Sequence, residues 1–255
     1  MQPIHNPQID LRYWILISLA SILGTNTGDL TVRLFNLTGQ GWFGLKHLGP
    51  LPLLIVAFIA VYLIEKKDRR LGEAYFWTAI ILIRTAATQI ADTVNGDLGL
   101  SLVYLIGGLA LGLTYLALQW QTKRTKPLDP VLVPDTTLTY WLTMLVAGVL
   151  GTVIGDELWH IMGLASSSLA LSVVMGILVF LGHKSFLKLT ALYWFGVLFA
   201  RIAGTAVGDW LAKTVARGGA GLTLEGATLL SGLVFIGACY FWKRQQHDQH
   251  DQDNR

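Results

Sequence analysis

Four aspartates recur at the same point of a repeated pattern, each in an otherwise apolar stretch of the chain. In every copy the aspartate follows a tryptophan by 15 residues and a threonine by four. A carboxylate near the centre of a bilayer costs about 2.5–3.5 kcal/mol and usually marks an ion or proton path. Carboxylate and hydroxyl oxygens are also the ligands that hard cations prefer. The pattern therefore predicts a site for a cation or for exchangeable protons. The aspartates, which are also the candidate ligands for a metal ion, are Asp29, Asp92, Asp156 and Asp209, and the threonines are Thr25, Thr88, Thr152 and Thr205.

A purely structural role is the alternative for the same aspartates. A glycine followed by an aspartate can end one helix and cap the N-terminus of the next. Gly155 and Asp156, which precede Glu157, fit that pattern. The sequence leaves both roles open.

Two arginines lie inside the same apolar stretches. Arg84 and Arg201 each follow the tryptophan of their copy by seven residues, about 10 Å along a helix. An arginine at that depth needs a partner or a water-filled cavity. We predict that both are counter-charges that compete with a cation for the carboxylates, and an inert buried pair is the alternative. Asn26 and Gln89 make the first two copies more polar at this level and join the predicted ion site.

Helices are the elements that must position these residues. At about 100° per residue, the tryptophan, threonine and aspartate of one copy fall on one face. A small residue stands one and five places before every aspartate, and such pairs let helices approach closely in a membrane. We therefore expect four helices to converge, with the aspartates at one depth and the threonines one turn deeper. The tryptophans are expected in the aromatic belt at the membrane interface. They are Trp14, Trp77, Trp141 and Trp194.

The composition excludes several classes of protein. Hydrophobic residues make up 53% and charged residues 14% of the 255 residues, which is typical of a polytopic membrane protein. The net charge is only +3 and the basic residues lie in short loops, so no nucleic-acid partner is expected. A single cysteine, Cys239, excludes an intrachain disulfide and a cysteine metal cluster. Because no nucleophile constellation or metalloprotease motif occurs, we expect neither an enzyme nor a cofactor.

Eight transmembrane helices are predicted, each about 20 residues long as a bilayer requires. The odd-numbered spans carry the repeated pattern and each even-numbered span returns the chain, which gives four helical hairpins. Two pseudo-symmetric halves, 1–121 and 137–243, are joined by a cytoplasmic linker, 122–136, and followed by a disordered polar tail, 244–255. The predicted spans are 11–29, 47–64, 73–92, 99–119, 137–156, 166–183, 187–208 and 221–242.

Basic residues set the predicted orientation. The loops and termini on one side hold 13 lysines and arginines, and those on the other side hold four. Cytoplasmic loops carry the excess of positive charge, so both termini are predicted to be cytoplasmic, with the aspartates toward the far side. The expected partners are the lipid bilayer and a small cation, and the oligomeric state stays open.

The tryptophans and the Gly/Ala-Asp pairs carry a resemblance that covers nearly the whole chain. The sequence resembles a family of bacterial integral membrane proteins built of four tandem two-helix repeats, each with a characteristic tryptophan. This resemblance implies an all-α, eight-helix fold in the bacterial inner membrane. The repeat has no known function, so no substrate is implied.

Together these observations predict a small secondary transporter or exporter of a cation, either a metal ion or a proton-coupled species. The alternative from another class is a non-transporting membrane scaffold or sensor, in which the repeated pattern serves only to build a tight bundle.

Overall fold

Regular structure in the described part of the chain is helical throughout. The computed structural model describes residues 7–37, 45–68, 73–122, 133, 136–183 and 190–253. Eight α-helices lie in these ranges, one for each predicted span, together with a short π-helix, η1 (Thr93–Asp97), and a 3-10 turn, η3 (Val215–Arg217). The α-helices are α1 (Leu11–Leu37), α2 (Leu51–Lys67), α3 (Ala74–Asp92), α4 (Leu102–Thr122), α5 (Leu138–Met162), α6 (Leu164–His183), α7 (Thr190–Ala212) and α8 (Thr223–Asp253).

Five of these helices are long and apolar enough to cross a membrane, so the chain is a multi-pass membrane protein. They are α1, α4, α5, α7 and α8, and α6 contains a shorter apolar stretch, Leu164–Phe180. Helix α2 has only 17 residues, and α3 carries the charged side chains of Arg84 and Asp92. Eight spans therefore remain a prediction.

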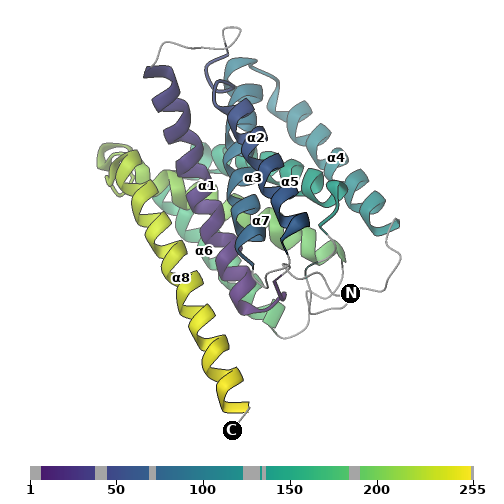
Figure 1. Cartoon of the computed structure of the whole chain (residues 1–255). Coiled ribbons are helices and arrows are strands. Elements are labelled where there is room, and N and C mark those ends of the chain that lie inside the picture. Colours follow the sequence, from purple (N-terminus) through teal and green to yellow (C-terminus); the bar gives the residue numbers. More distant parts are fainter. Residues whose placement is uncertain are drawn as a thin grey trace.

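Helices α1, α3, α5 and α7 form a closed ring, in which each packs against the next and α7 packs back against α1 (Figure 1). Small residues allow the close approach. A Cβ atom on Gly204 of α7 would lie 2.4 Å from Cβ of Ser21 on α1, and one on Gly24 of α1 would lie 2.4 Å from Cβ of Arg84 on α3. In both contacts, the residue five places before the aspartate of one helix meets the residue eight places before the aspartate of its neighbour. The same two positions meet between α3 and α5, as Ala87 with Gly148, and between α5 and α7, as Gly151 with Arg201. The predicted packing role of the small residues thus builds the ring.

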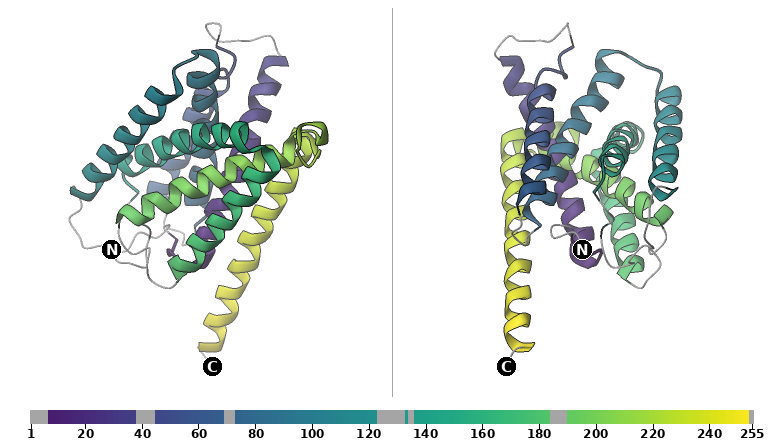
Figure 2. Two further views of the ribbon diagram at one scale, coloured as in Figure 1. Left: turned by 180° about the vertical axis from the view of Figure 1, so that it is seen from behind. Right: turned by 45° about the vertical axis from the view of Figure 1, so that its right-hand side comes forward.

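The even-numbered helices surround this ring, and within the described ranges they pack against their predicted hairpin partners only in the second half, where α6 contacts α5 and α8 contacts α7. Helices α2, α4, α6 and α8 pack chiefly on α3, α5, α7 and α1, so each lies mainly on the ring helix that follows it, and α8 closes on α1 (Figures 1 and 2). Among the described residues, neither α1 with α2 nor α3 with α4 forms an extensive contact. The chain between Leu37 and Leu51 is long enough to carry α2 away from α1, which explains the difference.

The outer helices present apolar side chains outward. On α4, Val103 is 77% exposed and Tyr104 is 82% exposed. Apolar faces of this extent are not stable in water, so they contact the lipid bilayer.

The two polar segments predicted from the sequence have different outcomes. The tail predicted to be disordered from residue 244 instead continues α8 to Asp253, because no glycine or proline follows Gly237 to interrupt the helix. The linker 122–136 lies largely outside the described residues. Within it Val133 is buried, and its N–H donates to the carbonyl of Pro7 at 3.0 Å.

Candidate functional site

The four ring helices enclose a cavity of about 290 Å³ at one end of the ring. It is lined by all four predicted aspartates and all four predicted threonines, so the structure brings these eight side chains together. Helical periodicity predicted the shared face within each helix, and the ring makes the four faces meet. Asn95, Trp159, His160 and Lys213 complete the lining.

Capping is not the role of these aspartates. Asp29, Asp156 and Asp209 lie inside α1, α5 and α7, which continue beyond them by eight, six and three residues. Asp92 ends α3, but its side chain makes no capping bond to the π-helix that follows. The capping hypothesis is therefore wrong, because three of the helices continue through the Gly-Asp pair and the Asp92 side chain makes no capping bond.

Three of the four carboxylates are free to bind a ligand. Asp209 forms an ion pair with Lys213, in which Nζ of Lys213 donates a hydrogen bond to Oδ2 of Asp209 at 2.8 Å. Asp29, Asp92 and Asp156 make no side-chain hydrogen bond or ion pair with any other residue that the structure describes. Within the described ranges, one carboxylate of the cavity thus has a side-chain partner and three have none.

Lys213 and Trp159 were not predicted as part of the site. The Lys213 ammonium lies 4.0 Å from the centroid of the Trp159 ring, over its face, in addition to its bond with Asp209. The imidazole of His160 stacks on the indole of Trp159, and the centroids of the two side-chain rings lie 3.7 Å apart. The four-residue spacing of Asp209 and Lys213 was the available signal, since such pairs face each other on a helix. Trp159 stands outside the repeated pattern.

Arg201 lies below the cavity and is fully buried. From α7 it donates to three other ring helices: Nε to Oγ1 of Thr152 at 2.9 Å, Nη1 to the carbonyl of Ser21 at 3.1 Å, and Nη2 to Oγ1 of Thr88. Its partners are neutral hydroxyls and a carbonyl, so the predicted direct pairing with the carboxylates is absent among the described ion pairs. The guanidinium closes the floor of the cavity instead.

Arg84 is also fully buried and reaches across the ring from α3. Nη2 donates to the carbonyl of Val197 on α7 at 3.4 Å, whereas Nε and Nη1 have no hydrogen-bond partner within the described residues. The ring interior thus contains two fixed positive charges beyond the carboxylates.

Asn26 and Gln89 were predicted to belong to the ion site but do not line the cavity. Both are fully buried; Gln89 donates to Oγ1 of Thr31 at 2.9 Å, and the Asn26 amide has no partner among the described residues. Each lies one residue after the cavity threonine, which turns it about 100° away around the helix.

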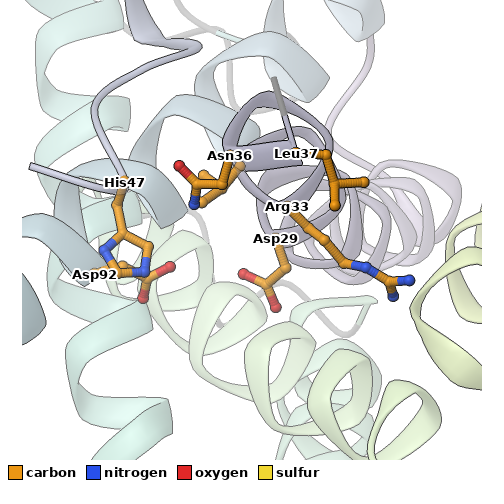
Figure 3. A pocket seen from close by; sticks show the side chains of 7 residues that line it. Asp29, Arg33, Asn36, Leu37, His47 and Asp92 are labelled. Carbon is orange, nitrogen blue, oxygen red and sulfur yellow. The ribbon is translucent and has the colours of Figure 1, made fainter. Parts of the chain in front are cut away.

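A second cavity of about 440 Å³ adjoins the first (Figure 3). Asp29 and Asp92 line both cavities. Beside Asp92, Nδ1 of His47 lies 2.9 Å from Oδ1 of Asp97. The remaining residues of this lining are Val32, Arg33, Asn36 and Leu37.

Aromatic side chains fill the opposite end of the ring. The prediction of an interfacial belt is wrong, because the four repeated tryptophans are at most 5% exposed. Each packs on the aromatic residue of a neighbouring ring helix, with centroids 5.5–6.1 Å apart, so the tryptophans turn inward to hold the ring together. The pairs are Trp14 with Tyr193, Trp77 with Tyr13, Trp141 with Phe76, and Trp194 with Tyr140.

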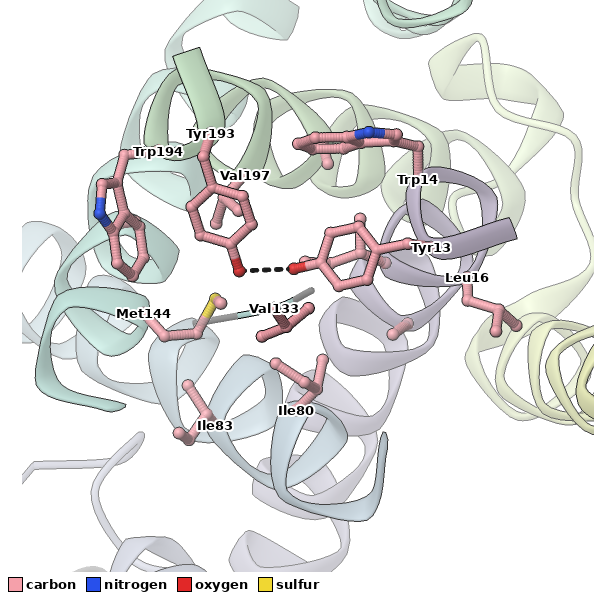
Figure 4. Packing of buried hydrophobic residues seen from close by; sticks show 14 of the residues in the cluster. Tyr13, Trp14, Leu16, Ile80, Ile83, Val133, Met144, Tyr193, Trp194 and Val197 are labelled. Carbon is pink, nitrogen blue, oxygen red and sulfur yellow. Dashed lines mark hydrogen bonds between the residues drawn. The ribbon is translucent and has the colours of Figure 1, made fainter. Parts of the chain in front are cut away.

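Three tyrosine hydroxyls meet inside this aromatic cluster. The Tyr193 hydroxyl lies 2.7 Å from that of Tyr13 (Figure 4). It also lies 2.8 Å from the hydroxyl of Tyr140. At the edge of the cluster, Nε1 of Trp77 donates to Glu73 at 3.0 Å. The cluster closes this end of the ring.

The carboxylates do not form a ready metal centre. In the described ranges, no three histidine, cysteine, aspartate or glutamate side chains are grouped closely enough to hold a metal ion. The four aspartates instead lie around a cavity that is much larger than one dehydrated ion.

Comparison with known proteins gives one match. A family model described as a repeat of unknown function, DUF347, matches residues 192–248, which include most of α7 and α8. The matched segment contains Trp194, Arg201, Thr205 and Asp209. No curated protein and no solved structure matches the chain. This apolar helical protein therefore contains a DUF347 repeat.

Proposed function

We propose that this protein is a small secondary transporter, or exporter, of a cation, and that the aspartate-lined cavity is its ion site. The observation that carries the proposal is the convergence of four aspartates and four threonines from four ring helices on one cavity. Oxygen ligands in this number suit a cation, and intramembrane carboxylates usually mark ion or proton paths.

The architecture that we propose for this function is four copies of the two-helix repeat, arranged as the halves 1–121 and 137–243. All eight helices span the bacterial inner membrane, and both termini are cytoplasmic. The contacts that recur between neighbouring ring helices support the four copies. An even number of helices per copy makes the repeats parallel, as in some known transporters. The cavity then opens on the side away from the cytoplasm.

The buried cations give the site its balance of charge. The cavity and the ring interior beyond it together hold four carboxylates and three fixed cations, Arg84, Arg201 and Lys213. One negative charge is therefore left over when all are ionised. A cation entering the cavity neutralises that charge. Release to the other side requires the ring helices to rearrange, because Arg201 and the aromatic cluster close the route beyond the threonines.

Flux measurements on proteoliposomes test the proposal. Currents on solid-supported membranes and a lumenal pH dye together detect both electrogenic transport and electroneutral proton exchange. Wild-type protein is expected to respond to at least one cation of a panel of Na⁺, K⁺, Mg²⁺, Mn²⁺ and alkylammonium ions. Asp92→Asn and Asp156→Asn are expected to abolish the response. Glu225→Gln is the matched control, because Glu225 pairs with Arg33 at 2.8 Å outside the cavity and is half exposed.

A membrane scaffold or sensor is the second candidate, and the closed floor of the cavity favours it. Under that function, the Asp→Asn variants lose as much thermal stability as variants at the helix contacts, and no cation moves. Full flux in all four Asp→Asn variants would refute the assignment of the aspartate-lined cavity as the ion site.

A further inference from the structure

We propose that the cation bound in this cavity is a primary organic ammonium ion, held by the unoccupied carboxylates in the way that Asp209 and Trp159 hold Lys213. The inference rests on the proposed function of the cavity as a cation site and names the class of its substrate.

The first observation is that an alkylammonium group already occupies one position of the site. The Lys213 ammonium donates to Asp209 at 2.8 Å and lies over the face of Trp159 at 4.0 Å. A carboxylate accepts a charge-assisted hydrogen bond from an ammonium group, and an aromatic face attracts the same positive charge. Because Lys213 is tethered to α7, it shows which chemistry the cavity wall accepts.

The second observation is the number of vacant acceptors. Asp29, Asp92 and Asp156 line the same cavity and have no polar partner among the described side chains. A primary ammonium has three N–H donors, as a lysine side chain does. It can therefore bond to these carboxylates as Lys213 bonds to Asp209.

The third observation is the size of the cavity. Its volume of about 290 Å³ is close to that of small-molecule sites, which begin near 300 Å³. No group of three ligating side chains in the described ranges is placed to hold a bare metal ion. An ammonium with a short carbon chain uses this space. It reaches the ring of Trp159 by displacing Lys213 from its face, because His160 stacks on the same indole.

The first experiment measures the apparent stability of purified wild-type protein against a panel of chlorides at equal ionic strength. A ligand that binds only the folded state raises the midpoint of thermal unfolding by mass action. Propylammonium is expected to raise it most. Tetramethylammonium, which carries the charge without N–H donors, and Na⁺, Mg²⁺ and Mn²⁺ are expected to raise it less.

Two variants then test the residues that carry the inference. Trp159→Leu removes the aromatic face and is expected to weaken propylammonium binding roughly two- to five-fold without changing the response to Na⁺. Lys213→Met removes the tethered competitor and is expected to strengthen propylammonium binding roughly two- to five-fold. Arg217→Met is the matched control, because Arg217 is an exposed cation only four residues after Lys213 and does not line the cavity.

Each outcome decides the question. Preferential stabilisation by propylammonium, with the two opposite effects of the variants, supports the inference. Equal or larger stabilisation by an inorganic cation overturns it; if Asp92→Asn abolishes that effect, the cation site of the proposed function still stands. No response to any cation, together with unchanged flux in the Asp→Asn variants, overturns both. If Trp159→Leu fails to fold, the ranking of the five chlorides on wild-type protein decides alone.

Discussion

The closed ring predicts that a single methyl group will be costly at one glycine and harmless at another. A Cβ atom added to Gly204 would lie 2.4 Å from Cβ of Ser21, 2.9 Å from its carbonyl carbon and 3.0 Å from the backbone nitrogen of Ile22. Two of these atoms belong to the backbone of α1, so no side-chain rotation relieves the clash. Helix α1 must move away from α7 by about 1 Å to restore ordinary contacts.

The expected loss of stability in Gly204→Ala is about 1–3 kcal/mol, the usual cost of overpacking a well-packed interior. Gly208→Ala is expected to lose less, because its Cβ would meet Thr25 and Asn26 side-chain atoms at 3.2–3.3 Å. Gly107→Ala on α4 is the matched control. Nothing lies within 4 Å of its Cβ position, so this variant is expected to gain up to about 1 kcal/mol from helix propensity.

Reversible denaturation in detergent micelles, followed by tryptophan fluorescence, measures the three variants side by side. The expected order of stability is Gly107→Ala, then Gly208→Ala, then Gly204→Ala. If Gly204→Ala is as stable as Gly107→Ala, α7 does not pack against α1 at Ser21, and the reasoning from a closed ring fails.

Two further variants probe the interior of the ring. Arg201→Met is expected to fold, because Thr88 and Thr152 still donate to the carbonyls of Arg84 and Gly148 at 3.2 and 2.9 Å. It is expected to bind cations more tightly by about 1–2 kcal/mol, because a nearby positive charge is gone. Thermal shifts with the cation panel measure this change in binding, and unchanged or weaker binding contradicts it. Tyr193→Phe is expected to lose about 1–3 kcal/mol of stability. This loss is expected to exceed that of Tyr13→Phe, because Tyr193 contacts two buried hydroxyls and Tyr13 contacts one. Equal losses in the same denaturation assay would show that the three hydroxyls do not act as a chain.

The positions of the helices and the polar face of each ring helix could be predicted from the sequence. Apolar stretches of about 20 residues specify helices in a bilayer, and the spacing of Trp194, Thr205 and Asp209 specifies a common face, because both depend only on local geometry. The spacing of Gly204 and Gly208 likewise indicated a close helix contact.

The choice of neighbours was decided only by the tertiary structure. Both an interfacial and an inward position are compatible with the sequence around Trp14, and the inward one prevails because Tyr193 and Gly196 of α7 offer it a flat surface. Helix α2 likewise packs on α3 and not on α1, and no local pattern in the sequence records that choice.

The candidate site divides in the same way. Local spacing places Asp29, Asp92, Asp156 and Asp209 on equivalent faces, but only the closing of the ring turns those faces toward one cavity. Arg201 was expected to face carboxylates and instead donates to Thr152, Thr88 and Ser21, because those groups of the neighbouring helices lie at its own depth. The sequence therefore determined which residues share a face of a helix, whereas non-local packing decided what each face meets.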